Sequence, residues 1–331
     1  MHWVYPYERL RSANVLSTLT AMDLASIGKP KAMVFVSSTS AVDTGYYVQY
    51  SDSLVGGRSN YEGIPESDDL EGARSSLKTG YGQSKWVSEK LLFEAGRRGL
   101  QGHIIRPGYV VGDSQTAGEC HSTLVGKMHV LIQILAVTNT DDFIWRMVKG
   151  CIQLGLIPDI NNTINMVPVD HVALCAGLAA VSPLLLPNAS MSVLHITARP
   201  MPTFNMMLSS LSQYGFGTEQ IEYLVWRRKL EQHVMEIQDN ALFPLLHFVL
   251  DDLPTSTKAP LLDDANTRAL LQRHSGRLAL TVDDDLMGLY LAWLVGAGFL
   301  PPPPPSTSIS CKTLPVLSHV GVIKAAGRTG A

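Results

Sequence analysis

Short apolar runs that end in polar or turn-forming residues set the pattern of the first third of the chain. Residues 31–40 read KAMVFVSSTS, an apolar run that ends in hydroxyl side chains. Residues 103–112 read HIIRPGYVVG and repeat the design, with Pro107 and Gly108 after the apolar start. Such runs are typical of strands buried on both faces of a parallel sheet, whose carboxyl ends bind ligands. The pattern therefore predicts two parallel strands with hydroxyls and a Pro-Gly turn at one edge.

Between these two runs, the apolar residues recur at helical spacing. We expect a helix that begins near Tyr81 and ends at Arg97-Arg98-Gly99, a basic last turn followed by a glycine stop. The residues expected to face inward are Trp86, Val87, Leu91, Leu92 and Ala95. The predicted unit is a strand, a helix and a second strand.

Tyr81 and Lys85 are the most informative polar pair in this unit. Residues four apart share one face of a helix, so the Lys85 ammonium can favour the ionised form of the Tyr81 phenol. Tyr81 is then a candidate proton donor near neutral pH. The ordinary alternative is a solvated helical pair, and the hydroxyl cluster after the first strand favours the catalytic interpretation.

The rest of the chain shows mostly helical patterns, with strands expected over residues 165–171 and 194–197. Asp170 and His171 are adjacent, and adjacent residues of a strand face opposite ways, so we expect a structural turn anchor rather than a catalytic pair. The basic run 226–229, WRRK, is interpreted mainly as a solvated helix face. A docking patch for an acidic carrier protein is the second interpretation.

The apolar stretch 286–300 predicts a closing helix. Thr281 can cap it, aspartates 283–285 complement its N-terminal dipole, and prolines 301–305 end it. Neither this stretch nor residues 128–137 reaches the length of about 20 residues that spans a bilayer. Residues 301–331 are expected to form a Pro-rich disordered tail.

Composition is consistent with a soluble α/β enzyme. With 331 residues, 46% apolar content and a formal net charge of -3, the chain can bury a full core and lacks the basic face of a nucleic-acid binder. Its four cysteines show neither Cys-x-x-Cys nor histidines at ligand spacing, so neither a metal site nor a disulfide framework is predicted. No Gly-x-Ser-x-Gly elbow is present, which disfavours an α/β-hydrolase. The expected location is a reducing cytoplasm.

At these residues the chain resembles the extended short-chain dehydrogenase/reductases, and more narrowly the C-terminal thioester-reductase domains of fungal aminoadipate reductases. The motifs that carry the narrower resemblance are HWVYPY at residues 2–7, GYGQSKW at 80–86, RPGY at 106–109, TNTDDF at 138–143, NMVPVDHV at 165–172 and LPTSTKAP at 253–260. The resemblance implies an α/β fold, the second half of a Rossmann-like doubly wound parallel sheet, joined to a mostly helical substrate-binding region.

The resemblance also assigns roles, residue by residue. It places the acid at Tyr81 and its helper, which also binds cofactor ribose, at Lys85. Ser38 matches the hydroxyl that binds the carbonyl oxygen, with Thr39 and Ser40 as competitors. The residues matched to the cofactor-facing segment are Tyr81, Lys85, Pro107, Gly108 and Tyr109.

Asn14 matches the asparagine that supports a proton-relay water in this superfamily. The surrounding NVLST at residues 14–18 has Ser17 where the family usually has glycine. The alternative role for Asn14 is a cap at the start of a helix that carries Val15 and Leu19.

The implied reaction is NADPH-dependent reduction of an acyl group, aminoadipyl in lysine biosynthesis, held as a phosphopantetheine thioester on a carrier domain. Its product is an aldehyde. Two alternatives stay open: an extended dehydrogenase acting on a free carbonyl, and a non-catalytic remnant or interaction module.

Two departures from the family pattern bear on the chain's organisation. No Gly-x-x-Gly-x-x-Gly turn precedes the Ser38 strand, which implies an incomplete fragment with half of the NADPH site missing and an exposed strand edge. Residues 115–137 separate two family motifs, and are either a retained intron read in frame or a genuine surface loop. The expected parts are the C-terminal half of the nucleotide-binding fold (1–114), this insertion (115–137), the substrate-binding region (138–300) and the tail (301–331).

Overall fold

The computed structural model describes residues 5–29, 31–56, 62–114, 142–182, 191–237, 240–274, 280–305 and 311–317. The helices are α1 (Tyr7–Arg11), α2 (Ser17–Ser26), α3 (Gly45–Gly56), α4 (Gly80–Arg97), α6 (Phe143–Leu154), α7 (Val169–Val181), α8 (Phe204–Gln213), α9 (Tyr223–Glu236), α10 (Leu246–Ser256), α11 (Ala265–His274) and α12 (Asp284–Gly296). The strands are β1 (Met33–Val36), β2 (Gly102–Pro107), β3 (Tyr109–Val111), β4 (Leu156–Pro158), β5 (Met166–Pro168), β6 (Met191–Ile196) and β7 (Glu219–Ile221). The predicted insertion at 115–137 lies outside the described residues.

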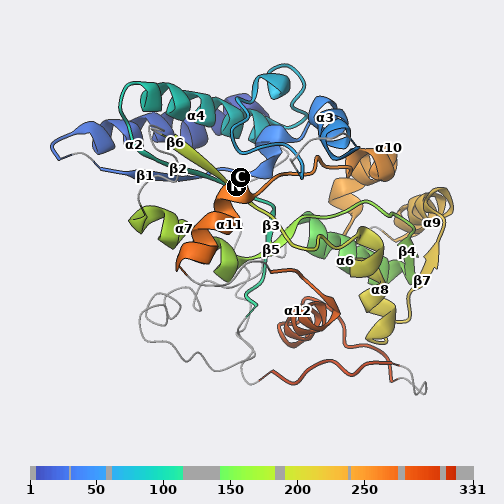
Figure 1. The fold of residues 1–331 in the computed structure, drawn as a ribbon. Coiled ribbons are helices and arrows are strands. Elements are labelled where there is room, and N and C mark those ends of the chain that lie inside the picture. Colours follow the sequence, from blue (N-terminus) through green and yellow to red (C-terminus); the bar gives the residue numbers. More distant parts are fainter. Residues whose placement is uncertain are drawn as a thin grey trace.

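The central sheet is parallel and has the strand order β1-β2-β6. Helices α2 and α4 lie on one face of it, and α7 and α11 on the other (Figure 1). The doubly wound α/β architecture and the strand–helix–strand unit are therefore confirmed. Within the described sheet β1 is an edge strand, and Val36 is 48% exposed, so this strand is not buried on both faces as its apolar run predicted.

Helix α4 buries a different face from the one predicted. Its apolar residues Trp86, Val87, Leu91 and Ala95 are only half-buried. The buried residues of α4 are mainly polar or glycine: Gly82, Ser84, Lys85, Ser88, Glu89, Leu92 and Gly96. The spacing of apolar residues predicted the wrong buried face because polar side chains can be buried as deeply as apolar ones when they are hydrogen-bonded.

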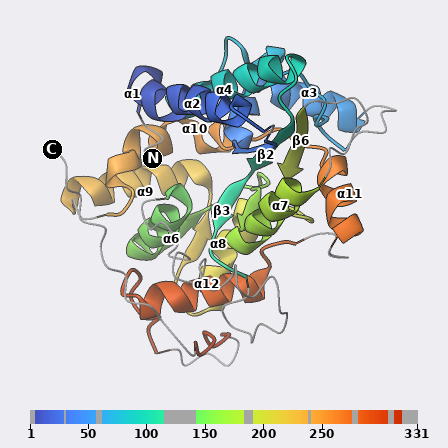
Figure 2. The same ribbon diagram turned by 90° about the vertical axis from the view of Figure 1, so that its left-hand side faces the viewer.

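A second region, formed by α6, α8, α9, α10 and α12, packs around a large apolar core. Trp145 and Trp226 lie fully inside it, together with Met147, Leu208 and Leu291. Trp226 therefore departs from the solvated helix face predicted for residues 226–229, of which Arg228 and Lys229 are exposed. Figure 2 shows α12 at the far end of the molecule from α2 and α4.

The strand expected over residues 165–171 is shorter than predicted. It ends at Pro168, and Asp170 and His171 occupy the first turn of α7, since Val169 already begins that helix. The Asp170 carboxylate accepts hydrogen bonds from the backbone N–H and the hydroxyl of Ser114, at 2.9 and 2.7 Å. Asp170 thus anchors the chain that follows β3, which is a structural role of the kind expected.

The closing helix is present as α12, but its cap is Asp283, whose carboxylate accepts from the Leu286 N–H at 2.9 Å. Thr281 instead donates to the Pro200 carbonyl. Composition predicted a disordered tail over residues 301–331, whereas Lys312 donates its backbone N–H to the Gln213 carbonyl at 2.8 Å and Leu314 packs against the apolar core.

None of the helices within the described ranges has the length and apolar character needed to cross a membrane.

Candidate active site

The end of β1 and the first turns of α4 bring the predicted hydroxyl, phenol and amine together. Thr79 caps α4 by accepting from the Gly82 N–H at 3.0 Å, which places Tyr81 in the first turn and Lys85 one turn later. Gly82 lets the helix approach the strand end, because a Cβ there would lie 2.6 Å from the Ser40 carbonyl oxygen. The local sequence therefore sets both the start of the helix and its distance from residues 38–40.

Burial raises the pKa of the Tyr81 phenol above its ordinary value, and a hydrogen bond with the Ser38 side chain partly offsets that rise. Ser38 also accepts from the Ser40 N–H and donates to the Ser40 hydroxyl, both at 3.1 Å. Of the three competing hydroxyls, Ser38 is the one whose hydrogen bond affects the pKa of the phenol. This contact supports the choice of Ser38 over Thr39 and Ser40.

Lys85 does not act on Tyr81 in the way predicted. Its ammonium donates to the Val36 carbonyl at 2.8 Å and lies 5.7 Å from the centre of the Tyr81 ring. Burial lowers the pKa of Lys85, while the neighbouring Glu89 carboxylate raises it. The prediction that the ammonium lowers the pKa of Tyr81 is therefore wrong for this arrangement, since the ammonium is held by the strand.

Asn14 lies in a π-helical turn, η1 (Ser12–Leu16), between α1 and α2. Its side-chain N–H donates to the Ser84 hydroxyl at 2.9 Å, and its carbonyl accepts from Thr18 and Ser88 at 2.7 and 3.1 Å. Asn14 is inside a continuous helical segment, so the capping alternative is wrong. Single π turns often occur at functional sites, and this one fixes Asn14 against α4.

Pro107 is the buried last residue of β2, Gly108 follows it, and Tyr109 begins β3. The carboxyl end of β2 lies beside that of β1. A Cβ on Gly108 would lie 2.2 Å from the Asn165 carbonyl oxygen. Glycine is therefore required here because the backbone just before β5 lies so close, whether or not a ligand binds. Tyr109 donates its backbone N–H to the same oxygen at 2.7 Å and is 45% exposed. The segment therefore presents an aromatic surface at the edge where ligands bind in such sheets.

Sequence reasoning missed the polar groups beneath this site. Glu89 and Arg106 form a fully buried ion pair, with 2.7 Å between Arg106 Nη2 and Glu89 Oε2. Arg106 Nη1 lies 2.9 Å from His195 Nε2 on β6. One signal in the sequence could have located Glu89: it follows Lys85 by four residues and therefore lies on the same face of the helix.

Comparison with known proteins gives concordant matches. The chain is 48% identical over 344 residues to L-2-aminoadipate reductase of Schizosaccharomyces pombe, covering 100% of this chain and 22% of that protein. It is 45% identical over 311 residues to L-2-aminoadipate reductase of Saccharomyces cerevisiae, covering 92% and 21%. The chain thus spans about a fifth of the length of these relatives.

Among solved structures, the terminal R domain from the myxalamid PKS-NRPS biosynthetic pathway matches with a TM-score of 0.72 and 30% identity, covering 92% of this chain and 68% of that one. Residues 1–176 match the NAD-binding family described as male sterility protein. The match extends over more than half of the sequence and includes Ser38, Tyr81 and Lys85. The chain belongs to the NAD-binding male sterility protein family.

Proposed function

We propose that this chain carries the catalytic site of an NADPH-dependent thioester reductase, which releases a carrier-bound acyl group as an aldehyde. The observation that carries the proposal is the convergence of Ser38, Tyr81 and Lys85 at one edge of the sheet. The similarity to reductase domains supports it.

In this proposal Ser38 and Tyr81 donate hydrogen bonds to the thioester oxygen as it becomes an oxyanion. Donors aimed at a developing charge are worth on the order of 3 kcal/mol each. When the tetrahedral adduct collapses, the C–S bond breaks, and the proton of Tyr81 balances the departing thiolate as a thiol. A raised pKa of Tyr81 is consistent with a phenol that stays protonated until this step.

The residues present fit a nicotinamide cofactor. The Lys85 amine and Tyr81 phenol can hold ribose hydroxyls, and the buried Pro107 is followed by Gly108 and the exposed Tyr109 at the carboxyl end of β2. NADPH, when bound, supplies the two electrons and the hydrogen that reduce the carbonyl carbon. Asn14 would orient the Tyr81 turn through Ser84, which donates to the Tyr81 carbonyl at 2.8 Å.

The proposed acyl group is aminoadipyl, attached through phosphopantetheine to a carrier domain of the same polypeptide, in a cytoplasmic route to lysine. The relatives named L-2-aminoadipate reductase support the choice of the aminoadipyl group. Reduction of a free carbonyl by the same residues is the second candidate function, because a thioester and an aldehyde both present a carbonyl oxygen to Ser38 and Tyr81.

The test is Tyr81→Phe in the complete protein that contains residues 1–331, with NADPH oxidation followed against an aminoadipyl-carrier thioester and against a free aldehyde. We expect a rate loss of about 100-fold or more with NADPH affinity nearly unchanged, because the ring remains while the proton donor is lost. The matched control is Tyr46→Phe, since Tyr46 is 55% exposed.

Full activity of Tyr81→Phe would sink the site assignment. Reduction of the aldehyde alone would replace the thioester function with the free-carbonyl one. Inactivity of the unmodified protein toward both substrates would favour a non-catalytic role.

A further inference from the structure

Glu89 is a fully buried carboxylate at the centre of the interface between α4 and the sheet. Arg106 donates to it from Nε, at 3.2 and 3.0 Å to its two oxygens, and from Nη2 at 2.7 Å. The Ser37 hydroxyl donates to the Oε1 atom of the same carboxylate. Ser37 is buried as well, at 3% exposure, so this contact is shielded from water.

The contacts follow the order of the strand end. Lys85 binds the Val36 carbonyl, Glu89 binds the Ser37 hydroxyl, and Tyr81 binds the Ser38 side chain. Tyr81, Lys85 and Glu89 are spaced by four residues and so share one face of α4. The last residue of β1 and the two residues that follow it are thus each held by a residue on this face of α4.

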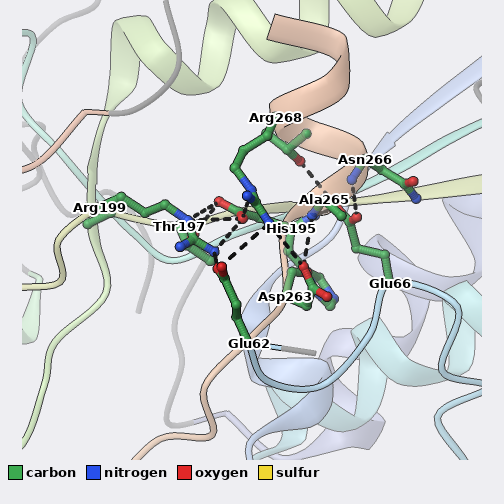
Figure 3. A network of polar contacts seen from close by, with 12 residues as sticks. Glu62, Glu66, His195, Thr197, Arg199, Asp263, Ala265, Asn266 and Arg268 are labelled. Atoms are coloured by element: carbon green, nitrogen blue, oxygen red, sulfur yellow. Dashed lines mark hydrogen bonds and ion pairs between the residues drawn. The ribbon is translucent and has the colours of Figure 1, made fainter. Parts of the chain in front are cut away.

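The far side of the ion pair is anchored to the rest of the sheet. Arginine can only donate, so the 2.9 Å contact makes His195 Nε2 an acceptor and leaves the proton on Nδ1, which donates to the Asp263 carbonyl at 2.8 Å. The His195 backbone N–H donates to Glu66 at 2.8 Å, and Glu66 accepts from the Asn266 N–H at 2.5 Å. Figure 3 shows His195 and Glu66 within the network that joins β6 to the start of α11. Arg106 is therefore held in place independently of Glu89.

We propose that the Ser37–Glu89 contact, fixed from behind by Arg106, is a positioning device that sets the distance between Ser38 and Tyr81 in the proposed reduction. Neither Ser37 nor Glu89 touches the substrate in this proposal, which rests on the proposed function.

A gain in folding stability does not by itself explain the buried Glu89–Arg106 ion pair. A buried ion pair is often no more stabilising than an apolar pair of similar volume, because desolvation offsets the attraction. An apolar pair, however, has no directional contact with which to hold Ser37. Displacement of a reacting group by about 1 Å can cost about 100-fold in rate, so a device that sets this distance affects the chemical step.

The test compares Ser37→Ala with Ser37→Thr in the complete protein, measuring kcat and KM with NADPH and the carrier thioester. Alanine removes the hydroxyl while Glu89 keeps all its bonds from Arg106, and threonine keeps the hydroxyl. We expect kcat to fall about 10-fold in Ser37→Ala with both KM values within about twofold, and threonine to restore most of the rate. The matched control is Ser192→Ala, a buried serine of β6 whose hydroxyl has no hydrogen-bond partner in the described structure.

A folded Ser37→Ala with full kcat overturns the positioning role, as does equal impairment of the alanine and threonine variants. A rise in KM with unchanged kcat overturns it too. Should Ser37→Ala not fold, Ser37→Cys carries the same expectation and the same refutations, because the thiol fills the space but donates weakly.

The proposed function is judged separately, by Tyr81→Phe. If Tyr81→Phe is inactive and Ser37→Ala is fully active, only the positioning role fails. If Tyr81→Phe is fully active, the proposed function fails whatever Ser37 does.

Discussion

The two packed regions of this chain bury opposite kinds of side chain. Where α4 packs against η1, α2 and the sheet, Ser84, Ser88 and Glu89 are each 0% exposed. Around α6 and α12, the residues at 0–1% exposure include Trp145 and Leu291. Both interfaces are dense, yet one is joined by directional hydrogen bonds and the other by apolar contact.

This difference determines what each region can specify. Apolar packing depends on volume and tolerates exchange between side chains of similar size. Hydrogen-bonded packing fixes the distance and direction between named atoms, and an unpaired buried group is costly. The region that carries the candidate site is the one that specifies atomic positions.

The largest expected effect tests the apolar region. Trp226→Ala should lower the free energy of unfolding by about 3–5 kcal/mol, since it removes a fully buried side chain and leaves a cavity. Urea unfolding at neutral pH measures it, with Leu224→Ala, 55% exposed on the same helix, as the control. A loss below about 1 kcal/mol would show that volume does not govern this core.

An intermediate effect should mark the polar region as the pH-sensitive one. Burial, followed by the Arg106 charge, lowers the pKa of His195 to about 3, against about 6.5 for an unfolded chain. The contribution of neutral His195 to the free energy of unfolding is fully present above pH 6.5 and is lost as the pH falls toward 3. Between pH 7 and pH 5, protonation of this histidine in the unfolded chain should therefore lower the free energy of unfolding by about 2 kcal/mol.

His195→Gln checks this expectation, because its carboxamide oxygen can still accept from Arg106 but cannot titrate. Urea unfolding at pH 7 and pH 5 should show that the free energy of unfolding falls less in the variant than in the unmodified protein, because the variant lacks the contribution of His195. Equal losses in the variant and the unmodified protein would mean that His195 is not held neutral. His233→Gln, on α9 outside this network, is the control.

The smallest expected effect concerns the start of α12. Asp283→Ala removes the carboxylate that accepts from the Leu286 N–H, and should lower the free energy of unfolding by about 1 kcal/mol. Asp285→Ala, 89% exposed in the side chain and not a partner in that contact, should cost much less. If both variants unfold alike, the helix start is set by tertiary packing alone.

Local sequence was sufficient for much of the first region. The apolar runs located β1 and β2, and the turn residues located the helix that carries Tyr81 and Lys85. Both are short-range properties, because a strand or helix is decided within one stretch of chain. The sequence also predicted that Ser38 and Tyr81 lie near one edge of the sheet, the carboxyl edge at which such folds bind ligands.

Other features were decided only by the tertiary structure. Ser37, Glu89, Arg106 and His195 come from four separate segments of the chain, and no local period connects them. The polar face of α4 was missed because hydrophobic periodicity counts apolar residues, whereas burial of a polar group depends on partners supplied from elsewhere in the fold. Sequence by itself determined where the reactive groups lie along the chain, and tertiary structure decided what holds them at their distances.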